Sequence, residues 1–136
     1  MPKIYTGQCL CGAMRYRAKN LSDIWWCHCK QCQRLTGLYV AAAGVARSDL
    51  EITGEVNWLP ISDKSQSGHC PKCGSYVFWN AKDFSTISIL AGSLNDTEDL
   101  VVKGHIFVSE KASFYAISDG LPQYDTYPPE GTRPSS

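Results

Sequence analysis

The chain has 136 residues, of which 43% are hydrophobic and 19% are charged, a composition typical of a single soluble globular domain. Thirteen basic and thirteen acidic residues give a formal net charge of zero, and no basic run is visible, so we expect no nucleic-acid partner. No apolar run approaches the ~18 residues that span a bilayer, and no apolar signal core begins the chain, so we expect a cytoplasmic protein without a membrane partner.

Short strands separated by turn residues dominate the expected secondary structure. Alternating apolar and polar residues predict strands at 4–8 and 13–17, and the small-residue run at 39–45 fits a strand buried on both faces. β-branched and aromatic residues predict four further strands, at 56–61, 76–79, 86–90 and 105–108. Helical periodicity is weak, and only single turns are expected, after Cys32 and near 97–100. The sequence therefore predicts a mainly β fold.

The chain is predicted to form a single domain. No linker interrupts residues 1–120. Residues 1–127 are assigned to a zinc-binding catalytic domain in which 121–127 form a strap, and the Pro- and Ser-rich residues 128–136 are predicted to form a flexible tail.

Seven cysteines are the main functional signal. In a reducing cytosol, closely spaced cysteines are more typical of metal ligands than of disulfides. An odd number also fits a complete disulfide framework poorly. They fall into three groups, Cys9 with Cys11, Cys27 with Cys29 and Cys32, and Cys70 with Cys73.

Two matched pairs predict one closed, structural zinc site. Tetrahedral zinc takes four thiolates, and short Cys turns place two of them on one side of the metal. Gly12 and Gly74 follow the second cysteine of each pair, where a glycine allows the backbone amides to turn toward the sulfurs. The predicted ligands are Cys9, Cys11, Cys70 and Cys73.

The remaining cysteines, Cys27, Cys29 and Cys32, predict a second zinc with an open corner, so we expect two zinc ions per chain. Catalytic zinc sites keep such a position for water or substrate, whereas structural sites close it. Three thiolates against a divalent cation leave a net charge of about −1, and this soft donor set favours a thiolate as the fourth ligand. The open site therefore predicts a thiol substrate.

Three other interpretations of these cysteines remain open. In one, the triad recruits one cysteine of the outer pairs. In another, Cys29 and Cys32 act as a dithiol switch, although the βαβ context of such switches is absent. His28 or a distant histidine could close the second site and make both metals structural. His69 and His105 are expected to be packing or surface residues.

Side chains near the triad suggest how a substrate could be held. Trp25 and Trp26 lead into it, and strand alternation predicts that one is buried while the other walls a pocket beside the metal. Lys30, Arg34 and Arg47 flank it in sequence, and a substrate carrying carboxylates needs such cations.

The cysteine motifs resemble those of the glutathione-dependent formaldehyde-activating enzymes, a family that includes the centromere protein V type. The similarity covers Gly-Gln-Cys-Leu-Cys-Gly at 7–12, Cys-His-Cys-Lys-Gln-Cys-Gln-Arg at 27–34 with Gly37, and Cys-Pro-Lys-Cys-Gly-Ser at 70–75. Softer matches lie at 89–94 and 117–122. The resemblance implies a zinc-stapled β-tent of small antiparallel sheets, with the triad at the catalytic zinc and the outer pairs at the structural one.

The resemblance also implies an activity. Founding members join formaldehyde to glutathione as carbon–sulfur lyases, a detoxification reaction that gives S-hydroxymethylglutathione. The expected partners are a glutathione-like thiol and a small aldehyde. The rivals are a non-catalytic two-zinc module for a protein partner and a zinc lyase or isomerase with another thiol or carbonyl substrate. The general acid is undetermined, with Tyr39, Asp119 and water as candidates, and no oligomeric state is predicted.

Overall fold

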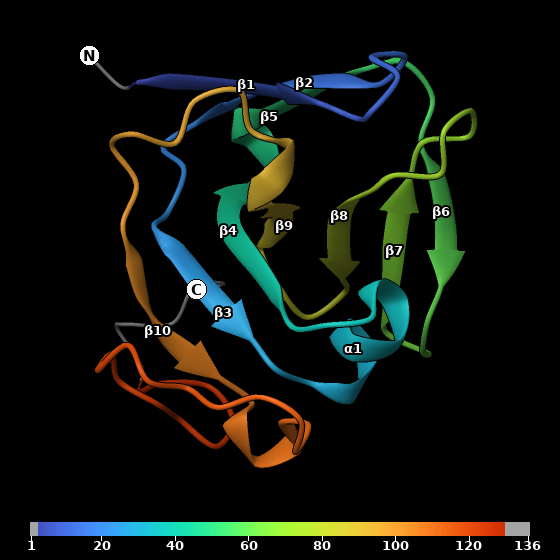
Figure 1. The fold of residues 1–136 in the computed structure, drawn as a ribbon. Coiled ribbons are helices and arrows are strands. Elements are labelled where there is room, and N and C mark those ends of the chain that lie inside the picture. The colour runs from blue at the N-terminus through green and yellow to red at the C-terminus, as the bar shows by residue number, and fades with distance from the viewer. Residues whose placement is uncertain (1–2, 130–136) are drawn as a thin grey trace.

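The computed structural model describes residues 3–129, and two β-sheets account for most of the regular structure (Figure 1). The smaller sheet is antiparallel, in the order β1-β2-β5. In β1 and β2 every second side chain is buried, which is the pattern of a sheet with one face on the core. Its strands are β1 (Ile4–Gln8), β2 (Arg15–Lys19) and β5 (Leu50–Thr53).

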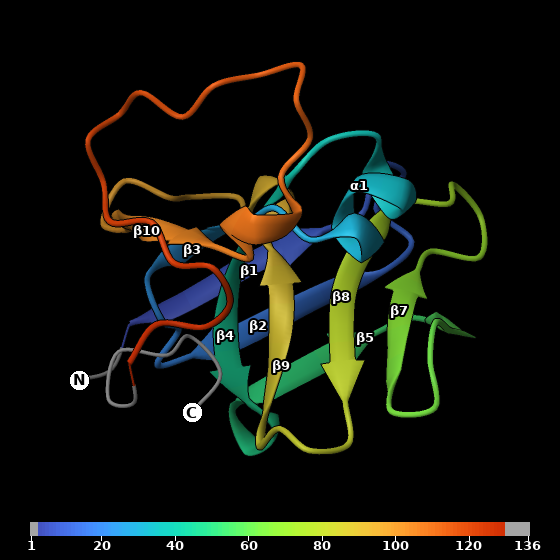
Figure 2. The same ribbon diagram turned by 90° about the horizontal axis from the view of Figure 1, so that it is seen from below.

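The larger sheet has the order β10-β3-β4-β9-β8-β7-β6. It curves, and the smaller sheet lies across one end of it (Figures 1 and 2). Neighbouring strands are antiparallel except β10 and β3, which are parallel. The predicted mainly β class is confirmed. The strands are β3 (Ile24–Cys27), β4 (Val40–Ala46), β6 (Asn57–Pro60), β7 (Ser65–His69), β8 (Tyr76–Ala81), β9 (Thr86–Leu90) and β10 (Val102–Ile106).

Within residues 3–129, helical structure is limited to short segments. The α-helix α1 (Lys30–Thr36) ends at Gly37, whose φ of 89° is the left-handed conformation that glycine adopts without strain. The three 3₁₀ turns are η1 (Arg47–Asp49), η2 (Ala91–Ser93) and η3 (Val108–Glu110). No helix in the described part of the chain is both long and apolar enough to cross a membrane.

The main core lies between the two sheets. Tyr16 of the smaller sheet meets Phe78 of β8 edge to face, with ring centroids 5.3 Å apart, and Met14, Val45 and Ile89 complete the contact. These side chains are almost fully buried. Because the inner faces of both sheets are apolar, burying them against each other drives the sheets together.

The chain after η3 returns along β10. The amide of His105 donates to the carbonyl of Pro122, and the amide of Tyr124 donates to the carbonyl of His105, each at 2.9 Å. Tyr124 also packs against Trp25. Of the predicted tail 128–136, Pro128 is buried, and residues 130–136 lie outside the described residues, so the tail boundary stays a prediction.

Candidate active site and metal centres

The two outer cysteine pairs meet at the tips of two hairpins. Cys9 and Cys11 lie in the turn between β1 and β2, and Cys70 and Cys73 lie in the turn between β7 and β8. The two turns have the same backbone pattern, in which the amide of the glycine that follows the second cysteine donates to the carbonyl of the first. The cluster therefore connects the smaller sheet to the larger one.

The spacing of these four sulfurs fits a tetrahedral metal. The Cys11 Sγ lies 3.7 Å from both the Cys9 Sγ and the Cys70 Sγ, and the four Sγ atoms lie within 4.8 Å of one another. A tetrahedron with Zn–S bonds of about 2.3 Å has an S···S edge of about 3.8 Å. The cluster can therefore hold a zinc ion with little rearrangement.

Ser75 links the two hairpin turns. Its hydroxyl accepts a hydrogen bond from the amide of Leu10 and lies 3.1 Å from the Cys73 Sγ. Hydrogen bonds from this hydroxyl, from the Ser75 amide and from the Cys11 amide lower the pKa of Cys73 to about 5. A thiol that ionises easily is ready to bind a metal.

The second cluster forms where β3 leads into α1. Cys27 ends β3, Cys29 is the N-cap of α1, and Cys32 lies in the first turn of the helix. The Cys29 Sγ accepts a hydrogen bond from the Cys32 amide at 3.3 Å. The three Sγ atoms lie within 4.8 Å of one another, so this cluster can also hold a metal ion. The fold thus gathers the seven cysteines into the same groups of four and three that the spacing predicted.

The triad sulfurs are packed more tightly than those of the first cluster. The Cys29 and Cys32 Sγ atoms lie 2.9 Å apart, which is longer than a disulfide bond of about 2.05 Å and shorter than the tetrahedral edge of about 3.8 Å. Hydrogen bonds with the Cys27 and Cys32 side chains, and then from the Cys32 and Gln31 amides, lower the pKa of Cys29 to about 3. Cys29 is therefore the triad thiol that ionises most easily.

His28 lies between two triad cysteines but cannot close the site. Its Nδ1 lies 2.7 Å from the Tyr115 hydroxyl, and its Nε2 lies 2.8 Å from Nδ1 of His105. The Nε2 of His105 in turn lies 2.8 Å from a carboxylate oxygen of Asp119. Because both ring nitrogens of His28 already have partners, no lone pair of this residue is free for a metal. The alternative in which His28 makes the second site structural is thereby excluded.

With both imidazoles neutral, the hydrogen bonds that link Tyr115, His28, His105 and Asp119 have a single assignment of donors. Asp119 accepts from Nε2–H of His105, which leaves its Nδ1 to accept from Nε2–H of His28. The Nδ1 of His28 then accepts from the Tyr115 hydroxyl. Burial, and then the charges of His105 and Lys111, lower the pKa of His28 to about 4, so this imidazole is neutral near neutral pH. The chain ties residues 115–119 to the loop that carries the triad.

Tyr115→Phe is expected to lower the free energy of unfolding by about 1 kcal/mol, because it leaves the buried Nδ1 of His28 without a donor. Tyr39→Phe is the matched control, since Tyr39 stacks on the same imidazole and its hydroxyl has no hydrogen bond within the described residues. Urea unfolding of the two variants measures the difference. Equal losses would show that the hydroxyl of Tyr115 contributes nothing.

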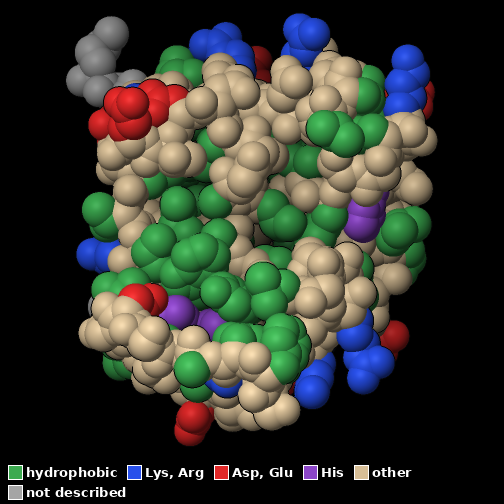
Figure 3. Space-filling view, viewed as in Figure 1, with side chains coloured by type: hydrophobic (Ala, Val, Ile, Leu, Met, Phe, Trp, Pro, Cys, Tyr) green, Lys and Arg blue, Asp and Glu red, His purple; other side chains and the backbone are tan. Residues whose placement is uncertain are grey.

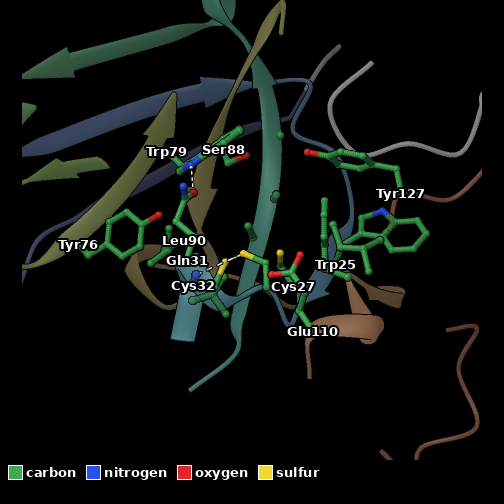
Figure 4. Close-up of a pocket in the computed structure, with 17 residues that line it drawn as sticks. Trp25, Cys27, Gln31, Cys32, Tyr76, Trp79, Ser88, Leu90, Glu110 and Tyr127 are labelled. Atoms are coloured by element: carbon green, nitrogen blue, oxygen red, sulfur yellow. Dashed lines mark hydrogen bonds between the residues drawn. The ribbon is translucent and has the colours of Figure 1, made fainter. Parts of the chain in front are cut away.

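The triad opens on a cavity of about 340 Å³ (Figure 4). Strands β3, β4, β8, β9 and β10 line it, together with α1 and the segment around η3. In Figure 4, Tyr76 and Trp79 stand on one side of the triad, and Trp25 and Tyr127 stand on the other. Trp79 donates from Nε1 to the side-chain oxygen of Gln31 at 2.9 Å, which fixes this wall to α1. The fourth side of the triad thus faces a largely apolar space.

The chain matches the model of the family described as glutathione-dependent formaldehyde-activating enzyme over residues 4–110. It belongs to this family. A crystal structure of a Rhodobacter sphaeroides protein has a similar fold, with a TM-score of 0.60 and 21% sequence identity over 74% of this chain and 98% of that one. A search of curated proteins gave no match.

The basic residues that the sequence suggested for binding a substrate carboxylate do not line the cavity of this formaldehyde-activating enzyme homologue. Lys30 and Arg34 lie exposed on α1, and Arg47 donates to the carbonyls of Ala81 and Phe84. None of these cations lines the cavity.

The other expected pocket residues are also distributed differently. Trp25, the buried tryptophan of the pair, lines the cavity, whereas Trp26 packs against Tyr39. Tyr39 and Asp119, the two candidates for a general acid, belong to the histidine side of the triad and not to the cavity. A general acid would therefore have to be water or a residue that lines the cavity.

Glu110 and Tyr76 both line the cavity, although the sequence did not identify them as residues of the candidate active site. Glu110 accepts a hydrogen bond from the Lys30 amide at 2.8 Å and so holds η3 against the start of α1. Tyr76 lies on the opposite wall, where burial, and then the nearby triad cysteines, raise its pKa. Neither residue belongs to a motif, and only the pairing of distant strands and turns brings them to the triad.

Proposed function

We propose that this chain is a zinc-dependent enzyme of the carbon–sulfur lyase type that adds a thiol to a small aldehyde such as formaldehyde. In this proposal Cys27, Cys29 and Cys32 hold the catalytic zinc, and the four-cysteine cluster holds a structural zinc. A zinc ion in the open site would supply Lewis acidity that keeps a bound thiol ionised near neutral pH. A cytoplasmic role in detoxification is part of the same proposal.

The observation that carries the proposal is the open side of the triad. The candidate fourth ligand, His28, is held by Tyr115 and His105, and no other His, Cys, Asp or Glu of residues 3–129 joins the group. The open side faces the cavity. Structural zinc sites complete their four ligands from the protein, and catalytic sites leave this position free.

The chain's own residues account for the remaining requirements of the addition. In the reaction the S–H bond breaks, a C–S bond forms, and the aldehyde oxygen gains the proton. The apolar walls exclude water that would compete with the thiol. Tyr76 is protonated at neutral pH, where its raised pKa only strengthens the ordinary preference of a phenol, so it can donate a hydrogen bond to the oxygen on which negative charge develops.

The test is the rate at which thiol and formaldehyde exchange with their hydroxymethyl adduct. Zinc-loaded protein, ¹³C-formaldehyde and either glutathione or phenylmethanethiol are followed by NMR exchange spectroscopy, because an enzyme changes the rate and not the equilibrium. We expect faster exchange with at least one thiol and none above background with Cys29→Ser. Absence of acceleration with every thiol would overturn the proposal.

Metal removal is expected to distinguish the two clusters. The protein should contain two zinc ions per chain, and a chromogenic chelator should remove one at least about tenfold faster than the other, because the triad lacks a fourth protein ligand and faces a cavity. Chelation kinetics followed by absorbance give both rates. Two equally inert zinc ions would instead favour a non-catalytic module.

A further inference from the structure

The charge of the cavity beside the triad does not suit glutathione. Among the described residues that line it, Glu110 is the only one with a charged side chain besides the cysteines, and no Lys or Arg contributes. Figure 3 shows a hollow rimmed by hydrophobic side chains, with Lys and Arg toward the edges of this face. Glutathione carries two carboxylates and one ammonium group.

Among the described residues that line the cavity, a carboxylate meets only groups of like charge. Three triad thiolates with a divalent zinc have a net charge of about −1, and the carboxylate of Glu110 adds another negative charge. At an effective dielectric constant near 20, like charges within about 10 Å reduce affinity by about tenfold or more. Loss of the carboxylate's hydration adds to this cost, since the described residues of the walls offer no cation to replace it.

The shape of the cavity suits an apolar group beside the sulfur. Two small residues of β4, Ala42 and Gly44, line it. This strand pairs with β3 on one side and β9 on the other. Aromatic rings rise on both sides, Trp25 from β3 and Trp79 from β8. A planar apolar group can therefore lie over the small residues and between the rings, where burial of its surface is favourable.

We propose that the thiol accepted by this chain is an uncharged arylmethyl or alkyl thiol, and that glutathione binds weakly. The inference rests on the function proposed above and adds the chemical class of the substrate. Because three cysteines already occupy one end of the cavity, the apolar part of the thiol occupies the space bounded by Trp25, Leu90 and Ile106. The product is the corresponding S-hydroxymethyl thioether.

Calorimetric titration of the zinc-loaded, full-length protein tests this inference without aldehyde. We expect phenylmethanethiol to bind with a Kd at least about tenfold below that of glutathione, and to change the absorption of the cobalt-substituted triad. Glutathione binding as tightly or more tightly would overturn the substrate class and leave the proposed function intact. If neither thiol binds or changes the cobalt spectrum, the proposed function itself fails, and the inference with it.

A matched pair of leucine variants tests the charge argument directly. Leu90 lines the cavity, whereas Leu59 is exposed on β6 and is not among the residues that line it. Leu90→Lys should shift the preference toward glutathione by about tenfold or more, and Leu59→Lys should leave it unchanged. The same shift in both variants, or none in Leu90→Lys, would contradict the inference.

Glu110→Gln provides a second test should Leu90→Lys fail to fold. Glutamine keeps an acceptor for the Lys30 amide and removes the negative charge. Glutathione should then bind several-fold more tightly, while the affinity for phenylmethanethiol stays the same. An equal change for both thiols would show that the charge of Glu110 does not select the substrate.

Discussion

Replacing Cys70 by serine is expected to lower the free energy of unfolding by about 5 kcal/mol or more, which is a large part of the stability of a domain of this size. Cys70 is 2% exposed, and its sulfur lies 3.7 Å from that of Cys11 in the opposite hairpin. A serine hydroxyl is a poor zinc ligand, so the variant loses the metal-mediated connection between the two sheets.

Thermal unfolding followed by circular dichroism, with zinc analysis of the purified protein, measures this effect. The expected fall in Tm is roughly 15 °C or more, with loss of zinc from this cluster. Chelation of wild-type protein to zero zinc should reproduce the destabilised state, because both treatments remove the same link. A variant with unchanged Tm would show that packing between Tyr16 and Phe78 holds the sheets together without metal.

Replacing Cys29 by serine is expected to have the opposite pattern, with activity reduced at least about 1000-fold and little change in stability. Cys29 is the N-cap of α1, and its sulfur accepts a hydrogen bond from the Cys32 amide. Serine is itself a good N-cap and retains that acceptor. The substitution therefore removes a metal ligand while the helix keeps its first turn.

Exchange kinetics and urea unfolding of the same preparation separate the two effects. The free energy of unfolding should change by less than about 1 kcal/mol, and the zinc content should fall from two per chain to one. Cys29→Ala is the useful companion, since it removes both the ligand and the cap. Stability losses in Cys29→Ser as large as those in Cys70→Ser would contradict the division into a catalytic and a structural site.

Strand prediction was most accurate where side chains alternate between core and solvent. The expected strands at 4–8 and 86–90 coincide with β1 and β9, in which every second side chain is buried. Strand β7 (Ser65–His69) was missed because its sequence is polar and contains glycine. It becomes a strand by pairing with β6 and β8, and at Gly68 a Cβ would lie only 2.9 Å from the Trp58 ring.

The sequence by itself indicated which cysteines form the two candidate metal sites, because cysteine spacing is a local property and each pair or triad lies within six residues. Only the tertiary structure decided what surrounds the open triad. His28 is adjacent to two ligands in sequence, yet its imidazole is directed away from the metal position by His105 and Tyr115, which are more than 70 residues distant. The cavity likewise combines Trp25, Tyr76 and Glu110 from separate parts of the chain. Which described residues line it, none of them Lys or Arg, follows from which strands pair in the sheet. Such long-range pairing cannot be deduced from local spacing.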